Sequence, residues 1–402
     1  MTRKQSQREL EQLQKNLEYT WWELKVFVAD IISPGEAAKE AMEDRMIELE
    51  NLVNTYGGVV ILKHIQNKTS PDYNTFIWEG RLDDIIEEMK REGANVLIFW
   101  NILKPQQIYK INDKLRSIWA KAWDRVDLIL KIFEKNANSR EAKLQIELAA
   151  IKHMWPRIFG MGMDLSKQWA GTWTRGKWET NTEIMKRHLR KKEEHIKKEL
   201  DHFKKVRAQH RQWRTRKGLH TAWVVGYTNA WKSTLTNTLT NKWVLAEDKL
   251  FATLWTSVWK MWLPTEDGRG KEVLINDTIW FIRDLPPNLI DAFSSTLEDS
   301  IESQILLHVI DANDPKLWEK IEVVEDILTT IWAKQKRIYV FNKIDDLSSE
   351  EFEIENWEWE IEKYSNKLDY LREVYTYLEP VFISAGKKIW LQELKDRIVS
   401  EL

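Results

Sequence analysis

The chain has 402 residues with 61 Lys plus Arg, 63 Asp plus Glu and no cysteine. This length is sufficient for two or three domains, and the balanced charge favours neither nucleic acid nor membrane as a partner of the whole surface. The absence of cysteine excludes disulfides and thiolate metal sites. No run of 18 apolar residues occurs and the N-terminus is too polar for a secretion signal, so we expect a cytoplasmic protein without a membrane span.

Glycine is scarce in this sequence and tryptophan is abundant. There are 14 Gly, where the usual share of about 7% would give roughly 28. There are also 23 Trp. Several of these tryptophans stand where the local chemistry calls for a small or flexible residue, which indicates substitution of a more ordinary sequence.

The first third of the chain predicts two regions. Residues 1–46 are highly charged and predict helix, with a break at Ser33-Pro34-Gly35. From residue 47 to 135 the pattern alternates between strand and helix. Strands are expected at 59–62 and 95–99, and helices at 81–92 and 105–118. This pattern predicts a small α/β domain with a parallel sheet.

Residues 136–218 predict a helical hairpin. One amphipathic helix is expected at 139–157 and a longer one at 181–214. Between Glu179 and Gly218 there are 14 Lys plus Arg against 6 Asp plus Glu, a net charge of +8. Three interpretations of this basic helix stay open: a solvated coiled-coil face, a contact with RNA phosphates, and a contact with an acidic protein.

Residues 219–402 return to an alternating pattern. Strands are expected at 222–226, 273–277, 305–311, 337–341 and 380–383, and helices at 232–240, 287–303, 315–333, 352–372 and 388–401. The order predicts a doubly wound, mostly parallel sheet whose ligand lies at the carboxyl ends of the strands.

A phosphate-binding loop is predicted after the first of these strands. The pattern G-x-x-x-x-G-K-[ST] is matched apart from its second glycine, where the chain has tryptophan. Backbone N–H groups and a helix N-terminus face an anion, the lysine reaches the β- and γ-phosphates, and the serine binds Mg²⁺. The loop residues are Gly226, Tyr227, Thr228, Asn229, Ala230, Trp231, Lys232, Ser233 and Thr234.

Three further motifs follow, each at the end of an expected strand. Asp277 can hold the Mg²⁺ shell, usually through water. In Asn342-Lys343-Ile344-Asp345, the last carboxylate can accept hydrogen bonds from guanine N1–H and N2–H₂, donors that adenine lacks. Asn342 would tie this segment to the phosphate loop, the stem of Lys343 would cover the base, and backbone N–H groups at Ser384-Ala385 could meet guanine O6. Taken alone, each motif is weak: the segment from Asn342 to Asp345 could be a surface turn after a strand, and Asp277-Thr278 could be the capped start of a helix. Their order on alternating elements favours a guanine nucleotide.

These residues resemble the HflX-type GTPases of the translation-factor-related class over about residues 47–402. The most specific likenesses are Gly226 to Ala230 before Lys232-Ser233-Thr234, Asp248 to Leu254, and Asp277-Thr278 followed by Phe281 to Pro286. Ser139 to Gln145 and the Thr174-Arg175-Gly176 loop also resemble that family. The resemblance implies an N-terminal α/β domain, a helical linker and a C-terminal P-loop GTPase domain.

The resemblance also implies roles for single residues. Thr253 would be the switch threonine that closes on Mg²⁺ and the γ-phosphate, with Thr256 a competitor, and Phe251 would lie in the same segment. Lys232 and Thr253 would be catalytic, and Ser233, Thr253 and Asp277 would hold the metal. Phe281 stands where many GTPases carry a water-orienting Gln, so intrinsic hydrolysis should be slow and stimulated by a partner.

The family has glycine at two nucleotide-contacting positions where this chain has Trp231 and Trp280. The first would crowd the loop or the phosphate volume, and the second would hinder γ-phosphate sensing. We therefore expect a GTP hydrolase whose nucleotide binding is weakened. It would be a monomer that contacts the large ribosomal subunit through its N-terminal domain and basic hairpin, in ribosome dissociation or recycling under stress. The alternative is a nucleotide-independent RNA- or ribosome-binding scaffold.

Overall fold

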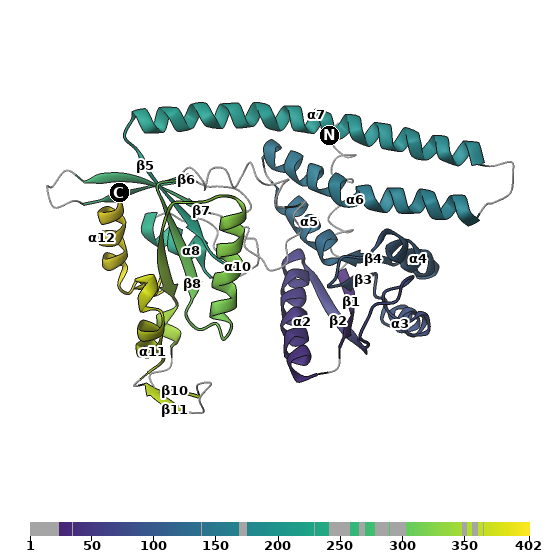
Figure 1. Cartoon of the computed structure of the whole chain (residues 1–402), viewed down its shortest axis with the longest axis horizontal. Coiled ribbons are helices and arrows are strands. Elements are labelled where there is room, and N and C mark those ends of the chain that lie inside the picture. Colours follow the sequence, from purple (N-terminus) through teal and green to yellow (C-terminus); the bar gives the residue numbers. More distant parts are fainter. Residues whose placement is uncertain are drawn as a thin grey trace, which may run out of the picture. The chain divides into compact units, whose positions relative to one another are not determined.

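The computed structural model describes residues 24–33, 35–137, 139–168, 175–228, 230–240, 258–264, 270–277, 289, 303–347, 352–355, 361–364 and 366–402. These residues belong to two compact units (Figure 1). Unit 1 comprises residues up to 135 together with 146–196, and unit 2 comprises residues 136–145 and 197–402. The two helices of the hairpin therefore contribute to both units, each of which is described by itself below.

A four-stranded parallel sheet forms the centre of unit 1. Its order is β2-β1-β3-β4, built from β1 (Leu24–Ile32), β2 (Gly58–Asn67), β3 (Val96–Phe99) and β4 (Lys121–Asp124). The intervening helices are α2 (Glu36–Tyr56), α3 (Glu79–Glu92), α4 (Pro105–Leu115), the 3₁₀ turn η1 (Arg116–Ile118) and α5 (Arg125–Asn136). Apolar residues of α3 and α4 pack with Phe27, Leu97 and Phe99 in one core.

Strand β1 corrects the expectation of helix for this part of the N-terminal segment. Val26, Phe27 and Val28 are buried, and β1 pairs with both β2 and β3. An uninterrupted run of β-branched and aromatic residues is typical of an inner strand that is covered on both faces. The charged flanks on either side obscured that run in the sequence. Residues 1–23 lie outside the described part of the chain.

The hairpin consists of α6 (Arg140–Gln168) and α7 (Arg175–Arg216), which run antiparallel (Figure 1). Both helices extend beyond the expected bounds. Within unit 1, Lys192 pairs with Glu147. Within unit 2, Arg140 Nη2 lies 2.9 Å from Glu199 Oε2, and Arg207 pairs with Glu141. Among the described helices, none has an apolar stretch long enough to cross a membrane.

Unit 2 contains a six-stranded sheet of order β12-β9-β8-β5-β7-β6. Its strands are β5 (His220–Val225), β6 (Val258–Leu263), β7 (Lys271–Asp277), β8 (Ile305–Asp311), β9 (Lys336–Asn342) and β12 (Val381–Phe382). All neighbouring pairs are parallel except β6 and β7. A mostly parallel sheet directs the carboxyl ends of its strands to one edge, as the sequence predicted.

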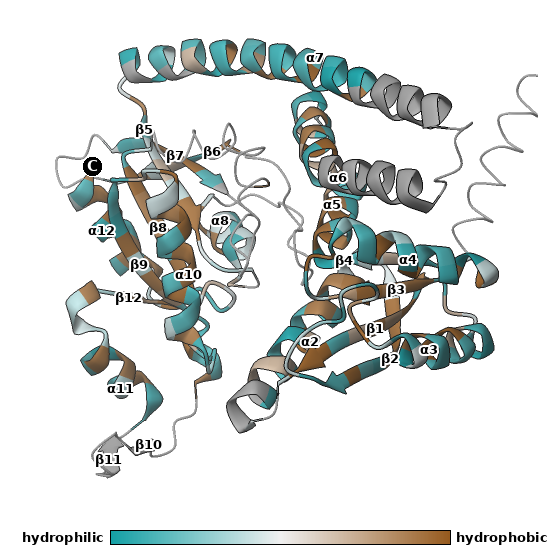
Figure 2. Cartoon of the chain, turned by 45° about the vertical axis from the view of Figure 1, so that its right-hand side comes forward, coloured by the Kyte–Doolittle hydropathy of each residue, from teal (hydrophilic) through white to brown (hydrophobic). Residues whose placement is uncertain are grey.

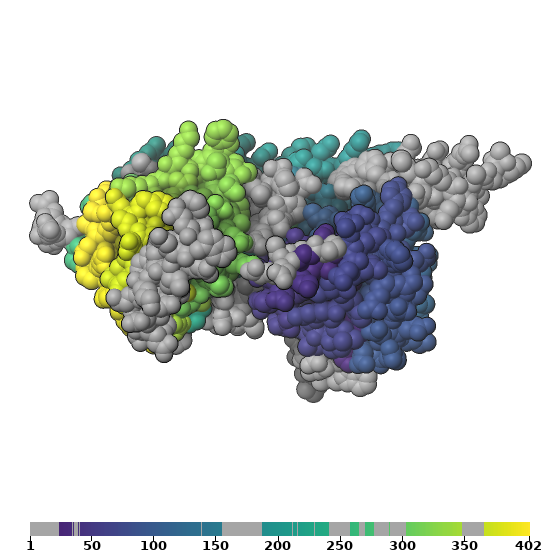
Figure 3. Space-filling view, turned by 60° about the horizontal axis from the view of Figure 1, so that its bottom comes forward, coloured from purple at the N-terminus to yellow at the C-terminus, as the bar shows by residue number. Residues whose placement is uncertain are grey.

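Helices cover both faces of this sheet. Leu235 of α8 (Lys232–Thr240) and Leu394 of α12 (Leu391–Glu401) pack in one core with β5, β7, β8 and β9. Leu317 of α10 (Leu317–Thr330) and Leu371 of α11 (Lys367–Val374) pack in another. The strands between these two layers are apolar (Figure 2). Parts of residues 303–347 and 366–402 are exposed on the face of unit 2 that Figure 3 shows.

One helix expected in unit 2 is wrong. Instead of helix at 352–372, the structure has an antiparallel pair of strands, β10 (Phe352–Glu355) and β11 (Ile361–Tyr364), and only then α11 and the 3₁₀ turn η3 (Thr376–Leu378). The alternation Phe-Glu-Ile-Glu has the period of two that strands require, and it outweighs the helix-forming glutamates. The edge strand β6 was also not expected. The helix expected at 287–303 lies almost entirely outside the described residues.

Candidate functional site

The phosphate loop follows β5 at the centre of the sheet. Gly226 has φ of 150°, and a Cβ at this position would lie 2.2 Å from the carbonyl oxygen of Val309 in β8. No other residue type fits so close a backbone approach. The loop then returns to α8, where the Trp231 carbonyl accepts the N–H of Leu235 at 3.0 Å and so begins the helix. The loop therefore ends at a helix N-terminus, which attracts anions.

Lys232 places a positive charge inside this loop. Its ammonium group is buried and donates to the carbonyl oxygens of Gly226 and Tyr227, both at 2.8 Å. Ser233 and Thr234 follow in the first turn of α8. A buried ammonium at a helix N-terminus makes this loop suited to a phosphate group.

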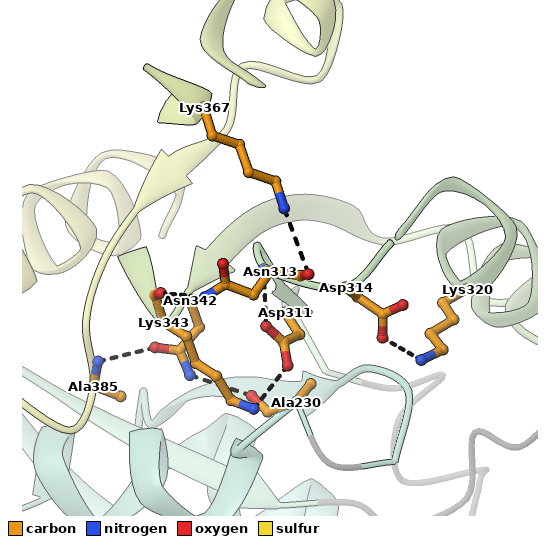
Figure 4. Close-up of polar contacts among 9 residues, drawn as sticks. All are labelled: Ala230, Asp311, Asn313, Asp314, Lys320, Asn342, Lys343, Lys367 and Ala385. Atoms are coloured by element: carbon orange, nitrogen blue, oxygen red, sulfur yellow. Dashed lines mark hydrogen bonds and ion pairs between the residues drawn. The ribbon is translucent and has the colours of Figure 1, made fainter. Parts of the chain in front are cut away.

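Asn342 joins the phosphate loop to a second loop (Figure 4). It is the fully buried last residue of β9. Its Nδ2 donates to the Ala230 carbonyl at 3.2 Å, and its Oδ1 accepts the N–H of Ala385 at 2.9 Å. One side chain therefore holds together three segments that are far apart in the sequence.

Asp345 lies in the short 3₁₀ turn η2 (Ile344–Asp346) that follows β9. Its carboxylate is 3.3 Å from Lys387 Nζ. Burial opposes its ionisation, but a hydrogen bond from Ser384 and the interaction with Lys387 outweigh burial, so the pKa of Asp345 lies below its ordinary value. The carboxylate is therefore a charged acceptor beside the Ser384-Ala385 segment.

Two polar residues at the end of β8 belong to this site and were missed by the sequence reading. Asp311 Oδ2 accepts from Lys343 Nζ at 2.7 Å, and Asn313 Nδ2 donates to the Lys343 carbonyl at 3.2 Å (Figure 4). They position Lys343, which has a left-handed φ of 66°. The signal was Asp-Ala-Asn-Asp-Pro, a turn-forming sequence that begins with the last residue of β8 at the ligand edge of the sheet.

Trp231 has the left-handed φ of 58°, and its side chain lies near the loops that follow β9 and β12. The Lys343 ammonium is 4.8 Å from the centroid of the indole. A Cβ added to Gly386 would lie 3.2 Å from Cζ3 of the same ring. The indole therefore packs toward the Asn342–Asp345 and Ser384–Gly386 segments, whereas the sequence left open whether it would crowd the loop or the phosphate volume.

Asp277 and Ser233 approach the same edge from neighbouring elements. Asp277 ends β7 and is in register with Val224 of β5, while Ser233 lies at the start of α8. A hydroxyl and a carboxylate are hard oxygen donors, which fit Mg²⁺. Asn229, Phe251, Thr253, Thr256, Trp280 and Phe281 lie outside the described residues.

Family models match most of the chain. A model described as "GTP-binding GTPase N-terminal" matches residues 43–134, "GTP-binding GTPase Middle Region" matches 136–214, and "50S ribosome-binding GTPase" matches 221–343. The GTPase HflX of Caldanaerobacter subterraneus subsp. tengcongensis is 38% identical over 381 residues, which are 94% of this chain and 81% of that protein. The chain belongs to the HflX family of GTPases.

Further comparisons agree with this family and with a P-loop GTPase domain. The GTPase HflX of Escherichia coli is 37% identical over 78% of this chain and 71% of that protein. Among solved structures, the complex of SsGBP with GDP is similar, with a TM-score of 0.52 and 25% identity over 94% of this chain and 98% of that chain. The HflX resemblance and the α/β fold class expected from the sequence are confirmed.

Proposed function

We propose that this chain is a GTP hydrolase that binds GTP or GDP with Mg²⁺ between the phosphate loop and the segments after β9 and β12. It would act as a cytoplasmic monomer that associates with the large ribosomal subunit in ribosome dissociation or recycling under stress. The observation that carries the nucleotide site is the pair of hydrogen bonds through which Asn342 joins Ala230 to Ala385. The family model described as a 50S ribosome-binding GTPase supports the ribosomal partner.

In this proposal the base is read by Asp345. The ionised carboxylate accepts from guanine N1–H and N2–H₂, while backbone N–H groups at Ser384-Ala385 meet guanine O6. An adenine base lacks the two donors and would leave the carboxylate unpaired, which gives strong discrimination. The direction of the pKa shift agrees with this role, since burial does not neutralise the carboxylate of Asp345.

The phosphates would lie at the N-terminus of α8. Lys232 would turn from the loop carbonyls to the β- and γ-phosphates, and Ser233, Asp277 and Thr253 would hold Mg²⁺. Bound Mg²⁺ supplies neutralisation of the charge that develops on the phosphates. Phe281 cannot orient a water molecule, so hydrolysis would be slow until the ribosome stimulates it.

We also propose that Trp231 and Trp280 weaken nucleotide binding. Trp231 supports this directly, because its indole lies against Lys343 and Gly386, beside the segment that would receive the base. A left-handed backbone at a residue with a Cβ adds strain of about 1–3 kcal/mol. The ammonium group of Lys343, whose stem would cover guanine, lies over the indole.

Fluorescence titration of the purified chain with labelled GDP, GTP and ADP tests the nucleotide site. We expect weak binding with a preference for guanine, and an increase in affinity of about 10-fold or more in Trp231→Gly. Trp332→Gly is the matched control, because it makes the same change at the amino end of β9, away from the ligand edge. Equal affinity for ADP, or no gain in Trp231→Gly, would contradict the proposal.

The scaffold alternative rests on α7, which is mostly hydrophilic along its described length (Figure 2). Lys198 and Lys205 are exposed and lie seven residues apart, about two turns along one face. Co-sedimentation with large ribosomal subunits separates the two functions. A GTPase should bind differently with GTP and GDP, whereas a scaffold should ignore the nucleotide and lose binding steeply as salt increases.

A further inference from the structure

The C-terminal ends of α3 and α7 show which residue type is suited to a left-handed backbone conformation just beyond a helix. After α3, Gly93 has φ of 66° and the next N–H, from Ala94, donates to the Met89 carbonyl at 2.9 Å. After α7, Gly218 has φ of 64° and the N–H of Leu219 donates to the Arg214 carbonyl at 3.1 Å. Both are Schellman caps, in which the residue just beyond the helix is left-handed and is usually glycine.

Two other helix ends have the same cap with tryptophan in place of glycine. After α10, Trp332 has φ of 61°, its N–H donates to the Thr329 carbonyl at 3.0 Å, and the N–H of Ala333 donates to the Leu328 carbonyl at 2.9 Å. After η1, Trp119 has φ of 59°, and the N–H of Ala120 donates to the Leu115 carbonyl at 3.2 Å. The backbone geometry therefore matches that of the glycine caps.

The side chains at these two caps do not compensate for the strained backbone. Trp119 is 93% exposed and Trp332 is 75% exposed, so their indoles bury little apolar surface. A residue with a Cβ is disfavoured in the left-handed region because the Cβ approaches the following carbonyl oxygen. Two large exposed apolar side chains at strained positions have no stabilising role in this fold.

Two more tryptophans share the left-handed backbone. Trp231 has φ of 58° and begins α8, and Trp390 has φ of 54° and begins α12. Among the residues that the structure describes, eight other than glycine have positive φ, and four of these are tryptophan. Asparagine and aspartate are the usual exceptions at such positions, and tryptophan is not.

We propose that glycine is the residue that the fold requires at positions 119, 231, 332 and 390, and that the protein made by its own cells carries glycine there. A single cause accounts for all four positions, namely one codon that the organism reads as glycine and that another genetic code reads as tryptophan. The scarcity of glycine and the excess of tryptophan, 14 against 23, follow from the same cause. The proposal does not rest on the proposed function, because Trp119 and Trp332 are outside the candidate site.

Thermal unfolding of the full chain tests the structural requirement. We expect Trp119→Gly to raise the midpoint of the transition of unit 1, and Trp332→Gly that of unit 2, each by about 2–4 °C. Trp213→Gly is the matched control, because this exposed tryptophan lies within α7 and has no left-handed φ, so glycine there should lower the midpoint. A fall in Trp119→Gly and Trp332→Gly like that of the control would overturn the proposal.

Peptide mass spectrometry of the protein purified from the organism that encodes it tests the second part. We expect peptides with glycine at positions 119, 231, 332 and 390, and tryptophan retained at buried Trp223, where the ring fills the core. Tryptophan at the four positions would overturn the inference. Failure of the nucleotide titration would leave both tests unaffected, so the two proposals fail independently.

Discussion

The sheets at the centres of the two units differ in how polar residues are used at the carboxyl ends of their parallel strands. In unit 2, Asn342 and Lys343 contact residues of other segments, namely Ala230, Ala385 and Asp311. In unit 1, the corresponding edge holds Asp124 at the end of β4, which is buried. Its Oδ1 accepts the N–H of Asp127 at 2.9 Å and its Oδ2 accepts the N–H of Leu103 at 3.3 Å.

Two other buried charged residues near this edge of unit 1, Arg125 and Asp30, also contact groups of the same domain. Arg125 is buried, pairs with Glu48 and lies with its guanidinium carbon 4.3 Å from the Trp100 ring centroid. Asp30, near the end of β1, is fully buried and accepts the N–H of Ile31 at 2.8 Å. In unit 2 the polar groups link loops that can surround a ligand, whereas in unit 1 Asp124 and Arg125 contact other groups of the same domain.

The largest effect that tests this contrast is expected from Asp345→Asn, made in the Trp231→Gly chain. The amide presents an N–H₂ group to guanine N2–H₂, so two donors face each other. We expect GDP affinity to fall by about 10⁴-fold. Xanthine has a carbonyl oxygen at that position, so the xanthosine nucleotide should bind the variant better than GDP does. Competition titration with the two diphosphates measures both changes.

The neighbouring carboxylate provides the control for this prediction. Asp346→Asn makes the same substitution in the same η2 turn and should leave the preference for guanine unchanged. Equal effects of the two substitutions would show that Asp345 acts through the charge of the turn, and the assignment of base recognition would then be wrong.

A smaller effect, on stability, is expected from Asn342→Ala. The substitution leaves the N–H of Ala385 and the carbonyl of Ala230 without their partner in a buried setting. Each of the two unsatisfied groups costs about 1–3 kcal/mol, so the free energy of unfolding of unit 2 should fall by about 2–6 kcal/mol. Denaturant unfolding measures the loss. Asn313→Ala, which removes one partly buried bond to Lys343, should cost less, and the reverse order would contradict the bridging role of Asn342.

The sequence was sufficient to predict the elements and motifs that depend on local pattern. The strands at 305–311 and 337–341, the helix from Lys232 and the order of motifs follow from apolar periodicity and loop composition. The antiparallel strands β10 and β11 were missed because charged residues in alternation resemble a helix surface. The contacts of Asp311 with Lys343 and of Trp231 with Gly386 depend on loop geometry, which no periodicity encodes.

In unit 1, Asp30→Asn should increase stability. Burial raises the pKa of Asp30 from 3.8 to about 6, although the Ile31 N–H and Arg45 act in the opposite direction. The folded state thus binds more protons than the unfolded state between these two values, and stability falls as pH rises through that window. Above it, replacing the buried charge by an amide should increase the free energy of unfolding by about 2–3 kcal/mol.

Denaturant titrations at pH 8 and pH 4 check this sign. The gain in Asp30→Asn should disappear at the lower pH, where the carboxyl group is also neutral. Asp124→Asn is the matched substitution at the same edge and should destabilise the domain, because both oxygens of Asp124 accept backbone N–H groups and an amide has only one oxygen. Stabilisation by Asp124→Asn as well would show that the hydrogen bonds from backbone N–H groups to Asp124 do not stabilise the domain.

The smallest expected effect concerns His308 of β8, which is buried beside Glu325 of α10. Burial lowers the pKa of His308 from 6.5, and its hydrogen bond to Glu325 at 3.0 Å opposes that shift only in part. As the pH falls, the unfolded chain binds a proton at His308 more readily than the folded chain does. The free energy of unfolding should therefore be unaffected by this histidine above pH 6.5 and should decrease as pH falls below it. His308→Phe keeps an aromatic ring against Tyr339 but cannot bind a proton, and Glu325 retains Arg337 at 2.7 Å. The fall in unfolding free energy between pH 7 and pH 5 should therefore be shallower in His308→Phe than in the parent chain. An equal or steeper fall would mean that the histidine is protonated in the folded protein and that Glu325 holds it as a charged pair.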